Sequence, residues 1–289
     1  MEMDNLKQLN WSEARDLLRT WRDNNERKSE EVLYFWKSLL EYNLNKLGSE
    51  KFVVLEQVCI AALDCYNIPV VDFCIKQLSN EFPNSLRVKK YYAMRLEAQE
   101  RYDDALKVLD SLIKKDETNN APRKRKIAIL KAQGRNVEAI KELTDYLKIF
   151  MADTEGWQEL SELYIAEQDF NKAAFCVEEL ILHNPHNHLL HQRYAEIRYT
   201  QGGFDNIELA RAYYCQALKL NPSNLRALYG VYLSSSNIAA SAKCTAQKKK
   251  EAVKLAEWAV SEIKKRYLAA KEDQKDTNLE DRLSALQIS

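Results

Sequence analysis

The feature that most constrains this chain is a repeat with a period of 34 residues. Val71, Ala105, Ala139 and Ala173 are spaced by this period, and each lies in the same pattern of apolar residues. The chain reads RYDDALKVLDSLI, RNVEAIKELTDYL and DFNKAAFCVEELI around the three alanines. A period of this length is typical of helix–turn–helix units that stack into a solenoid. Such a chain works by presenting a long curved surface, and it seldom carries chemistry of its own.

The repeat resembles the tetratricopeptide pattern, which places small residues where two helices meet and proline after the second helix. The best copy matches at Trp157, Leu160, Ser161, Tyr164, Ala173, Val177, Leu180 and Pro185. Pro83, Pro185 and Pro222 occupy one repeat position, just past a helix end, where proline belongs. Small residues allow the backbones to approach, and bulky residues fill the space between them. We therefore predict an all-α fold: a right-handed superhelical solenoid of tetratricopeptide-like helix-turn-helix repeats with atypical terminal capping helices.

Charge and hydropathy argue against a nucleic-acid-binding or membrane-spanning protein. The chain has 43 basic and 43 acidic residues, so it has no overall field that would attract nucleic acid or an anionic membrane. No apolar stretch is long enough to span a bilayer, and the polar start MEMDNLKQLN lacks the apolar core of a signal peptide. We expect a soluble chain that is not secreted.

The pattern divides the chain into five segments. These are N-terminal capping helices (1–50), a solenoid of about five repeats (51–235), a flexible loop (236–247), a C-terminal capping helix (248–270) and a mobile tail (271–289). Asn10 and Glu13 predict a capping box at the first helix. A second helix is expected over 29–47, with Gly48 ending it. Within the tail, Leu279, Leu283 and Leu286 have the spacing of a short amphipathic turn.

Histidine and cysteine residues give no sign of a metal site. All four histidines lie in HNPHNHLLH (183–191), around a turn between repeats, with no cysteine or carboxylate at a recognised ligand spacing. The six cysteines form no CxxC pair, and several occupy helix-packing positions, as small buried apolar residues do in a reducing compartment. No motif for catalysis or cofactor binding is present. We therefore expect no metal, no cofactor and no enzymatic activity.

Two basic runs open successive repeats. Arg87, Lys89 and Lys90 begin one, and RKRK (123–126) begins the next, so that Lys90 and Lys124 are equivalent in the repeat register. Cations at a helix start oppose the helix dipole, at a cost of about 0.3–1 kcal/mol each. An acidic partner segment would offset that cost. A solvated helix start explains the same run equally well.

In solenoids of this type, the first helix of each repeat lines the concave face. The register gives Arg87, Lys90, Met94, Glu97, Lys124, Ala128, Lys131, Gln158, Glu162, Ile165, Gln192, Glu196 and Tyr199 as the lining residues. This predicted lining changes from basic to acidic along the chain. We expect it to bind an extended or helical protein segment of mixed charge, because a phosphate backbone would need a continuous basic stripe.

A more specific resemblance rests on several segments. They are ERYDDA (100–105), RKRKIAILKAQGRNVEAI (123–140), AAFCVEEL (173–180), NPHNHL (184–189), YTQGG (199–203) and ALKLN (217–221). Together with the W-E-R-DL-R-WR-N spacing near the N-terminus, they resemble the family of subunit 2 of the endoplasmic reticulum (ER) membrane protein complex. The likeness extends from about residue 11 to residue 270 and weakens in the 271–289 tail.

The resemblance implies a non-catalytic scaffold, peripheral to the cytoplasmic face of the ER membrane, within a multi-subunit insertase for tail-anchored and multi-pass proteins. Its implied partners are cytosolic parts of membrane-embedded subunits and a soluble, metalloprotease-like subunit. Contact with the membrane would be indirect, through these partners, because no strongly basic amphipathic face is evident.

The alternative is a tetratricopeptide co-chaperone adaptor that binds the acidic C-termini of heat-shock proteins. That clamp needs lysine at repeat position 5 and asparagine at position 9. The corresponding pairs here are Lys90/Met94, Lys124/Ala128, Gln158/Glu162 and Gln192/Glu196. No asparagine occupies position 9, so the clamp is incomplete. A nucleic-acid-binding helical repeat is a remoter option, which the balanced charge disfavours.

Overall fold

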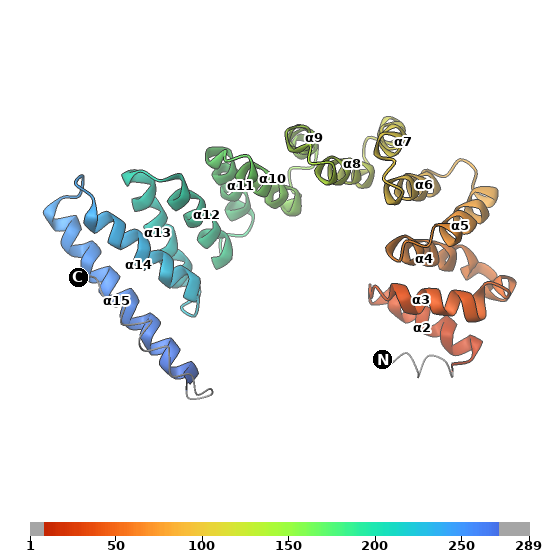
Figure 1. The fold of residues 1–289 in the computed structure, drawn as a ribbon, viewed down its shortest axis with the longest axis horizontal. Coiled ribbons are helices and arrows are strands. Elements are labelled where there is room, and N and C mark those ends of the chain that lie inside the picture. Colours follow the sequence, from red (N-terminus) through yellow and green to blue (C-terminus); the bar gives the residue numbers. More distant parts are fainter. Residues whose placement is uncertain (1–8, 272–289) are drawn as a thin grey trace. The chain divides into compact units, whose positions relative to one another are not determined.

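The computed structural model describes residues 9–271, with side chains up to residue 268. In this part of the chain, helices are the regular elements (Figure 1). The contacts divide the chain into two units, Met1–Arg135 and Asn136–Ser289. This boundary lies inside the range 51–235 that the sequence predicted as one solenoid. The predicted class, an all-α fold of tetratricopeptide-like repeats, is confirmed.

The first unit contains α2 to α8 in chain order. Its elements are α2 (Trp11–Asp23), α3 (Ser29–Phe35), η1 (Trp36–Leu40), η2 (Leu44–Glu50), α4 (Lys51–Asp64), α5 (Ile68–Glu81), α6 (Leu86–Ala98), α7 (Tyr102–Lys115) and α8 (Asn120–Ala132). Helices α4 and α5 pack against each other, as do α6 and α7. The small residues that the repeat pattern places between paired helices, among them Cys59, Ala93 and Ala105, are completely buried.

The N-terminal helix begins as the sequence predicts. The Glu13 backbone N–H donates to the Asn10 side chain at 3.0 Å, and the Asn10 backbone N–H donates to the Glu13 carboxylate at 2.9 Å. This reciprocal capping box satisfies two N–H groups that a helix start leaves without partners. Further along α2, Trp21 stacks on Phe35 with ring centroids 5.8 Å apart, which joins α2 to α3.

The single helix predicted over 29–47 is wrong. Helix α3 ends at Phe35, a π-helical turn follows, and a 3₁₀ segment runs from Leu44 to Glu50. The Asn43 side chain donates to the Leu39 carbonyl at 3.0 Å, where a continuing helix would place a backbone N–H. Gly48 then reverses the backbone with φ +53°, a conformation that favours glycine.

The second unit contains the remaining helices. They are α9 (Asn136–Ile149), α10 (Thr154–Ala166), α11 (Phe170–His183), α12 (His188–Gln201), α13 (Phe204–Leu220), α14 (Leu225–Ala240) and α15 (Ala246–Lys271). Each of the pairs α10–α11, α12–α13 and α14–α15 packs together (Figure 1). Ala173, Ala195 and Ala210 are completely buried between paired helices.

The loop predicted over 236–247 is shorter than expected. Helix α14 continues to Ala240, so only five residues, 241–245, separate it from α15. Ser234 and Ser235 are fully buried within α14, and the Ser234 hydroxyl donates to the Gly230 carbonyl at 2.6 Å. A serine can be buried inside a helix when its hydroxyl donates a hydrogen bond to a backbone carbonyl of the preceding turn. The prediction from composition is therefore wrong for residues 236–240, which continue α14.

Helix α15 occupies the range predicted for a C-terminal helix, and it packs against α14. Its buried residues are Ala252, Ala256, Ala259 and Ile263, one side of the helix. Apart from Lys271, which ends α15, the predicted tail with its three leucines lies outside the described residues. Across residues 9–271, no helix combines the length and the apolar character needed to cross a bilayer.

A close helix contact in the second unit depends on the absence of a side chain. Gly230 in α14 faces the ring of Tyr214 in α13, and a Cβ added to this glycine would lie 2.4 Å from the Tyr214 Cε1 atom. Tyr214 is itself only 5% exposed, so its ring has little room to move away. The α13–α14 contact therefore requires glycine at this position.

We expect Gly230→Ala to lower the free energy of unfolding by about 1–3 kcal/mol, because the added methyl group overpacks the α13–α14 contact. Thermal unfolding of the full chain, followed by circular dichroism, measures this effect. In a Tyr214→Leu background the same change should cost much less, since the ring that it meets is gone. An equal cost in both backgrounds would contradict this account.

Candidate partner-binding groove

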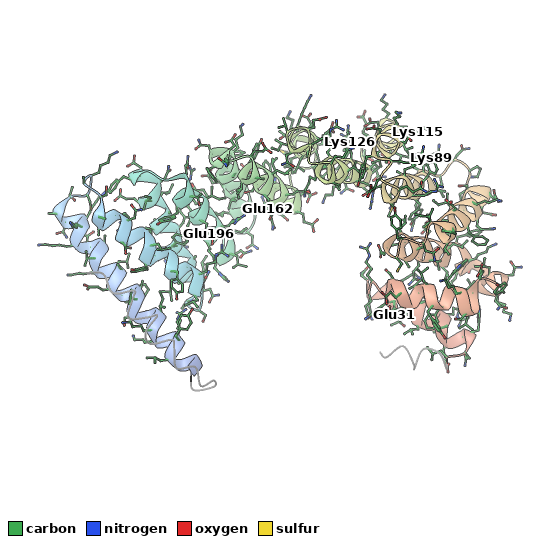
Figure 2. The ribbon with its side chains drawn as sticks, viewed as in Figure 1. Glu31, Lys89, Lys115, Lys126, Glu162 and Glu196 are labelled. Carbon is green, nitrogen blue, oxygen red and sulfur yellow. The ribbon has the colours of Figure 1, made fainter. Side chains whose placement is uncertain are left out.

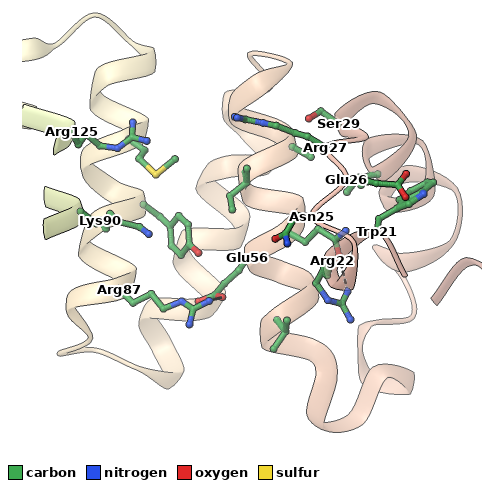
Figure 3. Close-up of a pocket in the computed structure, with 18 of the residues that line it drawn as sticks. Trp21, Arg22, Asn25, Glu26, Arg27, Ser29, Glu56, Arg87, Lys90 and Arg125 are labelled. Carbon is green, nitrogen blue, oxygen red and sulfur yellow. Dashed lines mark hydrogen bonds and ion pairs between the residues drawn. The ribbon is translucent and has the colours of Figure 1, made fainter. Parts of the chain in front are cut away.

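A groove of about 970 Å³ lies within the first unit. We call it the first-unit groove. Its walls come from the end of α2 and its connection to α3, and from α4, α6 and α8 (Figure 3).

The lining of the first-unit groove follows the 34-residue period. Equivalent positions of three successive first helices supply nine of the lining residues: Val53, Arg87 and Ala121; Glu56, Lys90 and Lys124; Ile60, Met94 and Ala128. These are positions 2, 5 and 9 of each repeat. The helices present them together because each first helix packs in the same orientation within its repeat. The periodicity of the sequence is thereby converted into one continuous lined surface.

The groove combines apolar surface with charge. Trp21, Ile60, Tyr91 and Met94 supply much of the apolar lining, and Trp21 and Tyr91 are almost fully buried. The charged lining residues are Arg22, Glu26, Arg27, Lys28, Glu56, Arg87, Lys90, Glu97, Lys124 and Arg125. Seven of these are cations and three are carboxylates, so the lining is basic although the whole chain is neutral.

Two ion pairs connect the helices that line the groove. The Arg87 guanidinium in α6 pairs with the Glu56 carboxylate in α4. The Arg125 Nη1 atom in α8 donates to the Glu97 carboxylate in α6 at 2.6 Å. Lys90 projects between these two arginines (Figure 3). Partial burial, together with the positive charges of Arg87 and Arg125, lowers the pKa of Lys90 from its ordinary value.

The opposite wall is held by further charged contacts. The Arg22 Nη1 atom donates to the Gln57 side chain at 2.7 Å, and this arginine also pairs with Glu50. Arg27 donates two hydrogen bonds to the Asp64 carboxylate, one of them from Nε at 2.7 Å. The Ser29 hydroxyl donates to the same carboxylate at 2.6 Å. These bonds join the α2–α3 connection to the end of α4.

These hydrogen bonds change the titration of Asp64. The donors on Arg27 and Ser29 and the positive charge of Arg27 favour the ionised carboxylate. They outweigh the effect of burial and lower the pKa of Asp64 from its ordinary value of 3.8.

Six of the thirteen residues predicted to line the concave face lie together in this groove. They are Arg87, Lys90, Met94, Glu97, Lys124 and Ala128. Lys131, at the end of α8, is exposed and does not line the groove. The other six belong to the second unit, where Gln158, Glu162 and Ile165 lie on α10, and Gln192, Glu196 and Tyr199 lie on α12.

The second-unit residues are engaged in contacts of their own. Glu196 accepts hydrogen bonds from Gln192 at 2.8 Å and from the Arg226 Nε atom at 2.5 Å. Gln192 is almost fully buried, and Tyr199 packs against the core cluster of α12 to α15. Glu162 remains exposed on α10 (Figure 2). The predicted acidic character of this region is therefore reduced at Glu196, where an arginine from α14 neutralises the carboxylate.

Sequence reasoning missed the groove residues on α4 and on the α2–α3 connection. The repeat register could have predicted three of them. One repeat back from Arg87, Lys90 and Met94, the equivalent positions are Val53, Glu56 and Ile60. Trp21 and Arg27 lie outside the periodic region, and no spacing places them in the groove. Their position depends on how α2 and α3 fold against α4.

The histidines and cysteines have structural surroundings. The His191 Nε2 atom lies 2.8 Å from the Pro185 carbonyl oxygen, and the His188 ring contacts the side chains of Asn221 and Asn224. In the described residues, no group of three or more potential ligands is arranged to hold a metal ion. Three cysteines, Cys59, Cys74 and Cys176, are buried, whereas Cys65 is exposed.

Comparison with known proteins gives a consistent set of relatives. The model of the EMC2 TPR-like repeat domain family matches residues 68–206. The chain is 50% identical to ER membrane protein complex subunit 2 of Xenopus tropicalis over 293 residues, which covers 100% of this chain and 99% of that protein. The protein of the same name from Dictyostelium discoideum is 34% identical over 270 residues, covering 89% and 83% of the two chains.

A solved structure supports the repeat fold. The C-terminal part of a TPR repeat-containing protein from Cytophaga hutchinsonii matches with a TM-score of 0.62 and 14% identity. The match covers 95% of this chain and 99% of that one. At this level of identity, the likeness supports the repeat fold alone.

We expect Asp64→Asn to lower the free energy of unfolding at neutral pH, because it removes the ion pair with Arg27. The loss should be only about 0.5–1 kcal/mol, because the Arg27 side chain is exposed to solvent. Folding lowers the pKa of Asp64, so the unfolded chain takes up this proton first as the pH falls. The stabilisation is therefore complete above the ordinary pKa of 3.8 and is lost as the pH falls through the lower pKa of the folded state.

Urea unfolding of the wild type and the variant between pH 7 and pH 3 measures the difference. The difference in the free energy of unfolding between wild type and variant should shrink as the pH falls below the ordinary pKa of 3.8. Glu41→Gln, at an exposed position away from the groove, serves as the control. A difference between wild type and Asp64→Asn that stays constant over this range would contradict the assignment.

Proposed function

This chain belongs to the family of subunit 2 of the ER membrane protein complex, and from that premise we propose that it serves as a scaffold that holds other subunits of the complex. Membership of the complex follows from the relatives of the chain. They are named as a complex subunit with a tetratricopeptide domain, a non-catalytic type of protein. The first-unit groove is the observation that supports a holding role.

The partners in this proposal are the cytosolic segments of membrane-embedded subunits and a soluble subunit of the metalloprotease-like kind. By holding them, the chain would contribute to the insertion of tail-anchored and multi-pass proteins into the ER membrane. It would act from the cytoplasmic face and reach the membrane through its partners. The resemblance of the sequence to this family is the basis of these finer assignments.

The groove suits the capture of a polypeptide segment for two reasons. Its apolar lining gains free energy when a partner covers it, by about 25 cal/mol per Å² of buried apolar area. Its charged groups lie on rigid helices that ion pairs hold together, so little conformational entropy is lost when a partner binds. A surface of this kind binds without closing a loop or moving a domain.

The co-chaperone alternative has weaker support. Lys90 and Lys124 lie in the groove at repeat position 5, as a heat-shock clamp requires. At position 9, however, the groove contains Met94 and Ala128, and neither side chain carries the amide that the clamp needs to bind a terminal carboxylate. An internal segment of a membrane subunit fits this lining better.

We expect Lys90→Glu combined with Lys124→Glu to reduce recovery of the membrane-embedded subunits at least tenfold, because the two changes reverse the charge of the groove. The measurement is affinity purification of the full chain from detergent-solubilised membranes, with quantitative mass spectrometry. Helicity should remain unchanged by circular dichroism, since both residues lie on a lining surface and not in the core.

The matched control is Lys76→Glu with Lys107→Glu, which reverses two exposed lysines on second helices outside the groove. Its yield of membrane subunits should equal that of the wild type. Undiminished recovery with the groove variant would remove the basic groove from the partner site. Recovery of soluble chaperones alone by the wild type would favour the adaptor.

A further inference from the structure

We propose that Lys90, between Arg87 and Arg125, binds one aspartate or glutamate side chain of a partner segment, and that apolar residues flank this acidic residue in the partner. This inference rests on the proposed function and specifies the chemistry of the segment that the first-unit groove accepts. It makes Lys90 the residue that selects the segment.

The charges close to Lys90 do not balance one another. The three cations Arg87, Lys90 and Arg125 lie side by side on one wall of the groove (Figure 3). Two carboxylates lie near these cations, and each already pairs with an arginine: Glu56 on α4 pairs with Arg87, and Glu97 on α6 pairs with Arg125. One positive charge therefore remains to be balanced. A carboxylate from outside the chain would complete the set.

The Lys90 ammonium group is placed to accept a carboxylate partner. Within residues 9–271, no carboxylate forms an ion pair with its ammonium group, whose closest aromatic contact is the ring of Tyr91 at 5.4 Å. The Lys90 side chain is partly buried. This burial and the positive charges of the two arginines both lower the pKa of Lys90. A partly desolvated ammonium group gains more from a carboxylate than an exposed one does.

Apolar residues line the groove together with the charged groups around Lys90. Ile60, Tyr91, Met94 and Ala128 line the same part of the groove. A segment that places a carboxylate at Lys90 would bring its neighbouring side chains against these residues. Apolar side chains there would exclude water from the new ion pair and strengthen it. The partner is therefore expected to carry an acidic residue within an apolar stretch and not a long acidic run.

The carboxylates in the lining also argue for a peptide over a phosphate backbone. Glu26, Glu56 and Glu97 lie among the seven cations and would repel successive phosphates. Binding of a nucleic acid gains strength from many phosphate contacts, whereas at Lys90 the groove offers a single ammonium group between two arginines that are already paired. A single side-chain carboxylate matches that arrangement.

A random dodecapeptide library displayed on phage, panned on the full chain, provides the first test. We expect the enriched peptides to share one aspartate or glutamate next to apolar residues. Panning on Lys90→Met should lose the acidic position while keeping the apolar preference, because methionine retains the apolar stem of the side chain. A failure to enrich any shared sequence, or an enrichment without the acidic position, would overturn the proposal.

The second test measures one enriched peptide and its Asp→Asn or Glu→Gln version by fluorescence anisotropy. On the wild type we expect the acidic peptide to bind about tenfold more tightly, since bonds to charged groups are the stronger ones. The ratio should fall to about 1 on Lys90→Met and should persist on Lys90→Arg. Lys89→Met is the matched control on the same helix, outside the groove and beside Lys115, and should keep the wild-type ratio (Figure 2).

The outcomes separate this inference from the proposed function. If the wild type shows no acidic preference, yet the double charge reversal still loses the membrane subunits, the scaffold role stands and the Lys90 assignment fails. If the preference is present but the chain recovers no membrane subunits, the scaffold role fails instead. A single-stranded oligonucleotide or an anionic phosphatidylserine vesicle that bound more tightly than the peptide, through Lys90, would also overturn the assignment.

Discussion

The close approach of two helix backbones within each repeat is the contact on which the rest of the structure depends. Small residues such as Ala93, Ala105 and Ala195 are completely buried at this contact, where a larger side chain would force the helices apart. Between successive pairs the same demand recurs at Gly230 of α14, because the ring of Tyr214 of α13 occupies the space that a Cβ would need. The distance between paired helices then determines which side chains remain outside the core.

Because this contact recurs with the repeat, the exposed face of each first helix recurs too. Positions 2, 5 and 9 of three successive repeats line the first-unit groove. A period in the sequence therefore becomes a surface with a repeated chemical character. Its charge is then adjusted by ion pairs between helices, such as Glu97 with Arg125, which neutralise some lining residues and leave Lys90 unbalanced.

Much of the fold, and about half of the candidate site, follows from local sequence signals. The capping box at Asn10 and Glu13, the helices of the repeats and six of the thirteen predicted lining residues required only spacing and residue type. The errors arose where side chains compete with the backbone. Asn43 ends a helix that periodicity would continue, and Ser234 bonds within a helix that composition would end.

The sequence by itself determined that the chain is a helical repeat protein, which residues face inward, and that cations recur at one position of the lining. Hydrophobic period and residue size carry this information over a few turns of helix. Only the tertiary structure decided which cations are neutralised and which walls complete the groove. Arg87 and Glu56 are 31 residues apart, and whether they meet depends on the packing of α4 against α6, which no local pattern encodes. The packing of α2 and α3 beside α4 brings Trp21 and Arg27 into the groove from outside the repeats.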